Sequence, residues 1–429
     1  MKKLLYTYLT IIVVLVISNS LFAQNIDEKY HQEIRTIAGL QKVRDAFQHI
    51  EQINDRTTSD LIMLTEIPAP PFMEEQRAKK YAEMLREAGA DEVRIDEVGN
   101  VIALRKGRTG GKKVALAGHM DTVFPEGTDV TVKVRGDTLY APGIGDDTRA
   151  LIVILTVLRA MEAIGIETES DVLLIGTVGE EGLGDLRGVK HLFSAQGPGI
   201  DSWIAIDGGG ISSIVNGALG SHRYRITFRG PGGHSWGAFG LANPQHALGR
   251  AIYYFVEEAD VFTSGGSRTS YNVGRIGGGT SINSIPYEAW MEIDMRSVSP
   301  ERLNGIDAIL QKAVKRALEE QNKMRRRGQE LTVEIDPVGN RPSGTISPET
   351  PLIQRAMAAI RYFGGNPRFG TSSTDSNIPI SMGIPAMTIG RGGQGGGGHS
   401  LDEWWMDRDG YKAIQYALLI LLSDAGIVQ

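Results

Sequence analysis

The chain has 429 residues, more than one hydrophobic core usually supports, so we expect two domains. Charged residues make up 22% and hydrophobic residues 41%, as in ordinary soluble globular proteins. A formal net charge of −6 without a long basic run argues against nucleic acid as a partner. Because the chain lacks cysteine, disulfides, thiolate catalysis and cysteine-ligated zinc are excluded, and any metal would be held by histidine and carboxylates.

The first residues have the pattern of a secretory signal. Met1-Lys2-Lys3 precedes an uncharged run over residues 4–22, and a small residue, Ala23, follows it. We expect cleavage after Ala23, with a signal peptide at residues 1–23. The run is also long enough to span a bilayer, so an uncleaved anchor is the alternative. Both interpretations place the folded part in the periplasm or outside the cell, and they limit membrane contact to this segment.

Helices and then a hairpin are predicted next. Apolar residues at helical spacing indicate helices between Asp27 and Leu64, and the proline-rich stretch that follows ends them. Residues 74–88 predict another helix. Residues 92–96 and 100–105 alternate in hydropathy around a short turn, which predicts a hairpin.

The apolar run Val114-Ala115-Leu116-Ala117 predicts a buried parallel strand. It ends at Gly118-His119-Met120-Asp121, so His119 would lie at the carboxyl end of the strand. In open α/β sheets, sites are built at that end. A single histidine there could equally be a structural residue with satisfied hydrogen bonds.

Paired carboxylates flank two further predicted elements. Asp146-Asp147 directly precedes an apolar helix predicted over residues 150–164, where an aspartate is often only a helix cap. The strand predicted at 171–178 ends in Gly179-Glu180-Glu181-Gly182. Those glycines let backbone and ligand approach closely, although a solvated turn is the alternative.

Two more predicted strands are followed by groups that can bind metal. Asp207 follows the strand at 203–206, and His399 follows the strand at 385–389 through a glycine-rich run. That run lacks the spacing and the lysine of a phosphate-binding loop, which argues against a nucleotide site.

From about residue 217 the pattern changes to a β-α-β-β-α-β order typical of a compact unit. The predicted elements are strands at 221–229, 270–276, 286–296 and 330–336, with helices at 243–259 and 300–325. We therefore place an inserted domain at 217–337, between the first part (24–216) and second part (338–429) of a catalytic domain. Helices at 348–363 and 410–422 complete the chain.

If the predicted strands are parallel, the functional groups converge on one edge of one sheet. Two imidazoles and three carboxylates suit a pair of zinc ions roughly 3.5–4 Å apart, with one carboxylate bridging them. The sequence thus predicts an α/β fold whose mixed, largely parallel sheet, flanked by helices, carries a di-zinc site, with an inserted lid or dimerisation domain.

The ordered motifs His119-x-Asp121, Asp146-Asp147, Glu180-Glu181, Asp207 and His399 resemble those of the di-zinc exopeptidase and deacylase family. That family includes peptidase T, glutamate carboxypeptidase and aminoacylase, and the resemblance spans nearly all of the mature chain. It implies that Asp146 bridges two zinc ions, which Co²⁺ or Mn²⁺ could replace. His119 and Asp207 would complete one site. Glu181 and His399 would complete the other.

The resemblance also assigns roles around the metals. Asp121 would orient His119 through its other ring nitrogen. Glu180 would act as general base, taking a proton from a metal-activated water and passing it to the leaving nitrogen. One departure is Thr148-Arg149-Ala150, where the family often has lysine and glycine, and the subfamily stays open.

In the inserted domain, Gly232-Gly233-His234-Ser235 resembles the segment of the family's lid histidine, which completes the oxyanion site, often from a neighbouring subunit. Asn283 and Arg296 resemble residues that hold the substrate backbone and carboxylate. For Arg296, an ordinary salt bridge at a strand end is the alternative. We therefore expect a homodimer joined through the inserted domains.

Three functions are compatible with this pattern. The first is a secreted or periplasmic exopeptidase acting on small peptides, and the second is an N-acyl-amino-acid deacylase or amidohydrolase of the same fold. The third is a catalytically silent metal-binding protein. Glu180 argues against the third, because a binding role needs no free general base.

Overall fold

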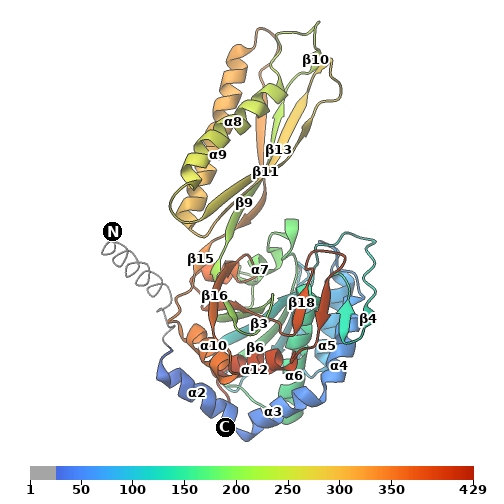
Figure 1. The fold of residues 1–429 in the computed structure, drawn as a ribbon, viewed down its shortest axis with the longest axis vertical. Helices are drawn as coiled ribbons and strands as arrows, with labels where there is room; N and C mark the ends of the chain where they lie inside the picture. Colours follow the sequence, from blue (N-terminus) through green and yellow to red (C-terminus); the bar gives the residue numbers. More distant parts are fainter. Residues whose placement is uncertain (1–25) are drawn as a thin grey trace, which may run out of the picture.

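The computed structural model describes residues 26–429, which form two bodies with separate hydrophobic cores (Figure 1). The predicted signal peptide, residues 1–23, lies outside the described residues. Across residues 26–429, no helix has both the length and the hydropathy needed to cross a membrane.

The first domain begins with helices, as predicted. The helices predicted between Asp27 and Leu64 are three, because the chain is extended at Leu40 and leaves helical geometry at Ile53. The Asp27 side chain caps the first helix by accepting a hydrogen bond from the backbone of Lys29. The first four helices of residues 26–429 are α2 (Glu28–Gly39), α3 (Gln41–Gln52), α4 (Asn54–Thr65) and α5 (Glu75–Glu87).

Nine strands of residues 26–429 form the main sheet of the first domain, in the order β1-β2-β6-β3-β7-β17-β8-β15, with β16 pairing β8. The strands β6, β3, β7 and β17 run parallel at the centre, and antiparallel pairs flank them. The predicted mixed sheet with a parallel centre is thus confirmed. The strands are β1 (Glu92–Ile95), β2 (Val101–Arg105), β3 (Lys113–His119), β6 (Asp171–Thr177), β7 (Ser202–Ile206), β8 (Ser213–Ala218), β15 (Gly344–Thr345), β16 (Arg368–Ser372) and β17 (Ala386–Ile389).

Helix α6 (Arg149–Ile164) is buried from Arg149 to Met161 and packs against β3, so it carries the centre of the core. It ends at Gly165, whose φ of 66° supplies the left-handed conformation of a helix C-cap. Helix α12 (Tyr411–Ala425) packs against both α6 and β3. The remaining helices of this domain are α7 (Arg187–Leu192), α10 (Pro351–Tyr362) and α11 (Asn377–Ser381).

A small sheet beside the main one joins distant segments of the chain. Its order is β18-β19-β5-β4, formed by β4 (Lys133–Arg135), β5 (Thr138–Tyr140), β18 (Gln394–Gly396) and β19 (Trp404–Met406). The segment leading to Asp146 is therefore held beside the segment that carries His399.

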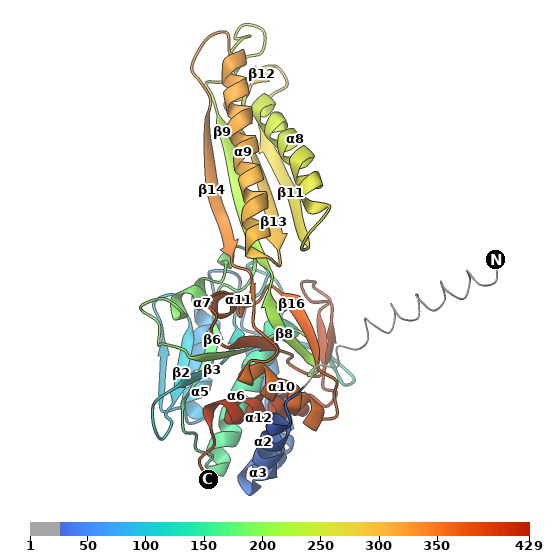
Figure 2. The same cartoon turned by 90° about the vertical axis from the view of Figure 1, so that its left-hand side faces the viewer.

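The second domain has the predicted order of elements. Its antiparallel sheet, β11-β13-β9-β14, is covered by two helices (Figure 2). Alternate residues of β13, from Ala289 to Met295, are buried in the core of this domain. The alternation of residues along this strand therefore identifies the face of the sheet that packs against the helices. The elements are β9 (Gly220–Arg229), α8 (Pro244–Thr263), β11 (Thr269–Gly278), β13 (Glu288–Ser297), α9 (Pro300–Met324) and β14 (Thr332–Arg341).

Both helices of this domain begin with the same type of N-terminal cap. Asn243 and Ser299 cap α8 and α9 with their side chains, and each is followed by proline at the first helical position. Strand β14 is longer than the predicted 330–336, because pairing with β9 continues to Arg341 opposite Ser221. This extension carries the end of β14 to the first domain, while β10 (Gly233–His234) and β12 (Ser284–Ile285) lie at the opposite, distal end (Figures 1 and 2).

Candidate metal centre

The carboxyl ends of the parallel strands meet at one edge of the main sheet. His119 is the last residue of β3, the pair Glu180 and Glu181 follows β6, and Asp207 follows β7. Three overlapping groups have ligand atoms within 4.8 Å of one another: His119, Asp146, Asp147 and Asp207; His119, Glu180 and Glu181; and Asp146, Glu181 and His399. The five residues predicted as metal ligands are therefore brought together.

Asp146 lies between the two imidazoles. Its Oδ1 is 3.1 Å from Nε2 of His119, and its Oδ2 is 3.1 Å from Nε2 of His399. The same His399 nitrogen is 2.8 Å from Oε1 of Glu181. A carboxylate that faces one imidazole with each oxygen has the orientation expected of a ligand shared by two sites.

Asp147 and Arg391 also belong to this region, although neither was predicted as a site residue. Asp147 Oδ2 accepts a hydrogen bond from the backbone N–H of His119 at 3.2 Å, and its buried Oδ1 has no partner. The Arg391 guanidinium lies 3.9 Å from Asp207 Oδ1. An unpartnered buried carboxylate oxygen is costly, so this site favours a nearby cation.

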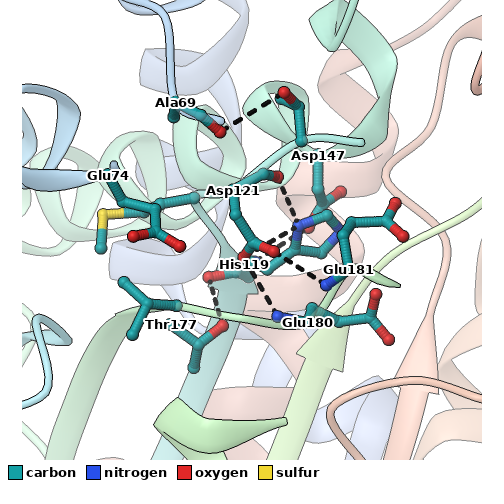
Figure 3. Close-up of polar contacts among 12 residues, drawn as sticks. Ala69, Glu74, His119, Asp121, Asp147, Thr177, Glu180 and Glu181 are labelled. Carbon is teal, nitrogen blue, oxygen red and sulfur yellow. Dashed lines mark hydrogen bonds and ion pairs between the residues drawn. The ribbon is translucent and has the colours of Figure 1, made fainter. Parts of the chain in front are cut away.

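Asp121 lies between His119 and the glutamate pair (Figure 3). Its backbone carbonyl, 2.9 Å from His119 Nδ1, makes the hydrogen bond to the ring, whereas its carboxylate is 3.9 Å away. The carboxylate instead accepts hydrogen bonds from the backbone N–H groups of Glu180 at 3.1 Å and Glu181 at 2.8 Å. Asp121 thus contacts the other ring nitrogen of His119, as the predicted orienting role requires, and its carboxylate in addition holds the glutamate turn.

Glu403 fixes the loop that carries Asp146. Its buried carboxylate accepts hydrogen bonds from the backbone N–H groups of Gly143 at 2.8 Å, Gly145 at 2.9 Å and Asp146 at 2.8 Å. Because Glu403 is four residues after His399, one side chain ties together the two segments that carry these ligands.

The charges of the centre fit divalent cations. Burial raises the pKa values of Asp147 and Asp207, and the positive charges of His119 and Arg391 only partly oppose this effect. The ionised carboxylates would therefore be stabilised by a bound cation. Burial opposes a charge on His119, but the surrounding aspartates outweigh it and raise its pKa well above the usual range. The hydrogen bond to Asp146 raises the pKa of His399 to about 9. Protons on the imidazoles thus occupy the positions where cations would bind, and the nitrogen and oxygen donor set suits zinc.

The sequence profile of Peptidase family M20/M25/M40 matches residues 115–423, a range that contains the whole centre. The chain belongs to this family. Family membership confirms the resemblance predicted from the motifs and supports a metal-dependent hydrolase of amide bonds.

Relatives within the family carry different activities in their names. The chain is 27% identical over 340 residues to succinyl-diaminopimelate desuccinylase of Corynebacterium glutamicum, covering 77% of this chain and 86% of that one. It is 27% identical over 335 residues to the cytosol non-specific dipeptidase of Escherichia coli, covering 68% and 63%. Among solved structures, a tripeptidase from Staphylococcus aureus aligns with a TM-score of 0.70 at 22% identity, covering 86% and 98%. The last comparison supports the fold.

The M20/M25/M40 centre of this chain also contains Arg341, which was not predicted. Its Nη1 donates to Glu180 Oε1 at 3.0 Å, and its Nη2 donates to the backbone carbonyl of Glu180. Burial raises the pKa of the Glu180 carboxyl well above its usual range, although the charge of Arg341 opposes that shift. A single arginine at the end of a strand has no spacing signal, and the same holds for Glu403, so sequence reasoning missed both.

Two of the three residues predicted in the inserted domain, His234 and Asn283, lie away from the centre. His234 of β10 and Asn283, the residue before β12, lie at the distal tip, where Ser235 N donates to the Asn283 carbonyl at 2.8 Å (Figure 1). Arg296, at the other end of the domain, pairs with Asp294 at 2.8 Å. The salt-bridge alternative for Arg296 is therefore what the structure contains.

Proposed function

We propose that the protein is a zinc-dependent exopeptidase that hydrolyses small peptides, with Glu180 as general base. The observation that carries this proposal is the convergence of the five predicted ligands from separate segments, with Glu180 as an additional carboxylate beside them. A site that only bound metal would not need that extra group.

In this proposal, His119, Asp146 and Asp207 hold one ion, and Asp146, Glu181 and His399 hold the other. When bound, the metal pair supplies a Lewis acid for the scissile carbonyl and lowers the pKa of an attacking water. Arg391 lies beside Asp207 and offsets part of the charge of that carboxylate, whereas the unpartnered oxygen of Asp147 adds negative charge that favours a cation.

Glu180 performs the proton transfer. Arg341 occupies its Oε1, so the other carboxylate oxygen is left to accept a proton from water and deliver it to the leaving nitrogen. The raised pKa of this buried carboxyl supports that role, because a carboxylate with a higher pKa is a stronger base.

A second candidate is deacylation of N-acyl amino acids. The name of the Corynebacterium relative favours it, whereas the name of the Escherichia coli relative favours a dipeptidase. Assaying the zinc-loaded protein on dipeptides, tripeptides and N-acyl amino acids separates the two. Turnover restricted to N-acyl amino acids would replace the peptidase assignment with the deacylase.

We further propose that the protein acts in the periplasm or outside the cell, delivered by the N-terminal segment. Sequencing the N-terminus of the mature protein tests this. A chain that begins at Gln24 is the expected result, and a retained Met1 with membrane association would identify an anchor instead.

The proposed partner is a second copy of the chain. His234 is remote from the centre of its own subunit, so its imidazole reaches a centre either through domain closure or from a partner in a homodimer. Exposed apolar side chains lie in the segments beside it, among them Trp236, Phe239 and Ile282. We expect this surface to be buried when the tip contacts the partner subunit or the first domain.

Metal removal tests the proposed function. Chelator-treated protein should lose peptide hydrolysis, and Zn²⁺, Co²⁺ or Mn²⁺ should restore it, because the donors are all nitrogen and oxygen. Metal analysis of the purified protein should give two ions per chain. Activity that persists in protein shown to be metal-free would overturn the proposal.

A further inference from the structure

The turn after β6 carries both the proposed general base and a predicted metal ligand. We call residues 179–186 the base turn. Four of its residues have positive φ, and for Asp185 and Leu186 this is unusual because they are not glycine. A turn in such a conformation persists only where surrounding contacts determine it.

The second domain supplies several of these contacts. Arg341, the last residue of β14, binds the Glu180 carboxylate and its carbonyl. Arg223 of β9 donates to the Gly182 carbonyl at 3.0 Å, and the backbone N–H of Asn340 donates to Asp185 Oδ1 at 2.9 Å. These residues lie side by side at the ends of paired strands, so they act on the base turn as one rigid edge.

Arg341 is the most specific of these contacts. It is buried, its Nη1 also donates to Ser373 Oγ at 2.9 Å, and its Nε has no partner. Within residues 26–429, Glu180 is the carboxylate that forms an ion pair with it. Two hydrogen bonds from one planar guanidinium fix both the main chain and the side chain of Glu180, a constraint that a single point contact cannot impose.

We propose that Arg341 is a positioning residue that sets the direction of the Glu180 carboxylate and couples the base turn to the second domain. This inference rests on the proposed role of Glu180 as general base. A rotation of the second domain moves the end of β14, and Arg341 transmits that movement to Glu180. Catalytic geometry therefore depends on where the second domain lies.

The test compares Arg341→Met and Arg341→Lys with Arg223→Met as a matched control. The control removes a second-domain contact with the same turn but leaves the Glu180 carboxylate untouched. For Arg341→Met we expect kcat to fall about 10- to 100-fold, because small misplacements of a catalytic group carry costs of that order. KM and metal content should be unchanged, Arg341→Lys should recover part of kcat, and Arg223→Met should have the smallest effect.

Hydrogen exchange provides a readout that does not depend on turnover. Backbone amides of residues 179–186 should exchange faster in Arg341→Met than in the wild-type protein, while amides of the distal tip should not change. If Arg341→Met does not fold, Arg341→Lys carries the same comparison.

Two results would overturn the inference. A raised KM with unchanged kcat in Arg341→Met would make Arg341 a substrate-binding residue. Unchanged hydrogen exchange in the base turn of the same variant would show that Arg341 does not couple this turn to the second domain. Failure of the proposed function is recognised separately, because Glu180→Gln would then retain kcat whatever the exchange data show. In the double variant Glu180→Gln/Arg341→Met, the losses in kcat should not add, since both changes act on one carboxylate.

Discussion

The metal centre and the distal tip of the second domain contain residues predicted for the same site, yet they differ in how complete they are. At the centre, the predicted ligands from five segments already face one another. At the tip, His234 is exposed, and its Nδ1 accepts weak hydrogen bonds from the backbone of Trp236 and Gly237. The ring is held in orientation, and among residues 26–429 its Nε2 has no hydrogen-bond partner. The proposed metal ligands thus lie together within one chain, whereas the proposed oxyanion group, His234, lies away from them.

The comparison predicts that removing the base spares the metals but stops the chemistry. In Glu180→Gln, kcat should fall at least about 10²-fold, since general bases contribute about 10²–10⁴. Metal content, measured by elemental analysis, should stay at the wild-type value because Glu180 is not assigned as a ligand. Near-normal kcat would place the base elsewhere.

The tip should matter for turnover and not for metal. His234→Ala should lower kcat by about 10²–10³, the usual cost of one oxyanion donor, and leave metal content unchanged. Equal loss of metal and activity would show that the two regions are not separate in function.

Mixing distinguishes a partner's histidine from the chain's own. Inactive Glu180→Gln protein and inactive His234→Ala protein should regain partial activity when their subunits exchange, because a mixed dimer contains one intact site. If exchange is demonstrated by mass and no activity returns, His234 acts within its own subunit.

Support of the centre by Glu403 should appear as weaker metal binding. In Glu403→Gln, the amide nitrogen cannot accept, so at least one backbone N–H of the Asp146 loop loses its partner. Metal affinity should fall about 10- to 100-fold, as for other residues that support ligands, and excess zinc should restore kcat. The exposed neighbour Asp402→Asn is the control. A kcat deficit that zinc does not correct would contradict this role.

The smallest predicted effect is the pH dependence of metal affinity that arises from proton release by His399. With a pKa of about 9, His399 is protonated in the metal-free protein at pH 7, and a metal must displace that proton. Affinity should therefore rise about tenfold per pH unit for each proton displaced as pH increases towards 9. In the metal-free protein the raised pKa stabilises the fold below about pH 6.5, and this contribution is lost as pH rises through about 9. Calorimetry in two buffers of different ionisation enthalpy measures the release, and none at pH 7 would contradict the charge assignment.

Much of the fold follows from local pattern. Continuous apolar runs predicted the parallel centre, because strands buried on both faces need no polar alternation. Alternation and helix caps predicted the second domain. The small sheet was not predicted, since β4 is exposed throughout and the sheet depends on pairing of β5 with β19, which lies far along the chain. The break at Ile53 also lacks a glycine or proline signal, whereas Gly39 directly precedes the break at Leu40.

The site residues also divide into those that the sequence predicted and those that it did not. Ligands that directly follow predicted strands were found from their positions, because strand ends of a parallel sheet converge. Arg341 and Glu403 were missed because their roles depend on backbone groups distant in sequence. Asp121 was expected to contact the His119 ring, and its carbonyl does so, but the hydrogen bonds of its carboxylate to the glutamate turn were not predicted. Such contacts come from tertiary geometry, which no spacing rule encodes.

Anomalous diffraction at the zinc edge from crystals of the zinc-loaded protein tests the central claim most directly. The account predicts two peaks roughly 3.5–4 Å apart. One should lie among His119, Asp146 and Asp207, and the other among Asp146, Glu181 and His399. Peaks away from Asp146, or no peak in a catalytically active crystal, would contradict it.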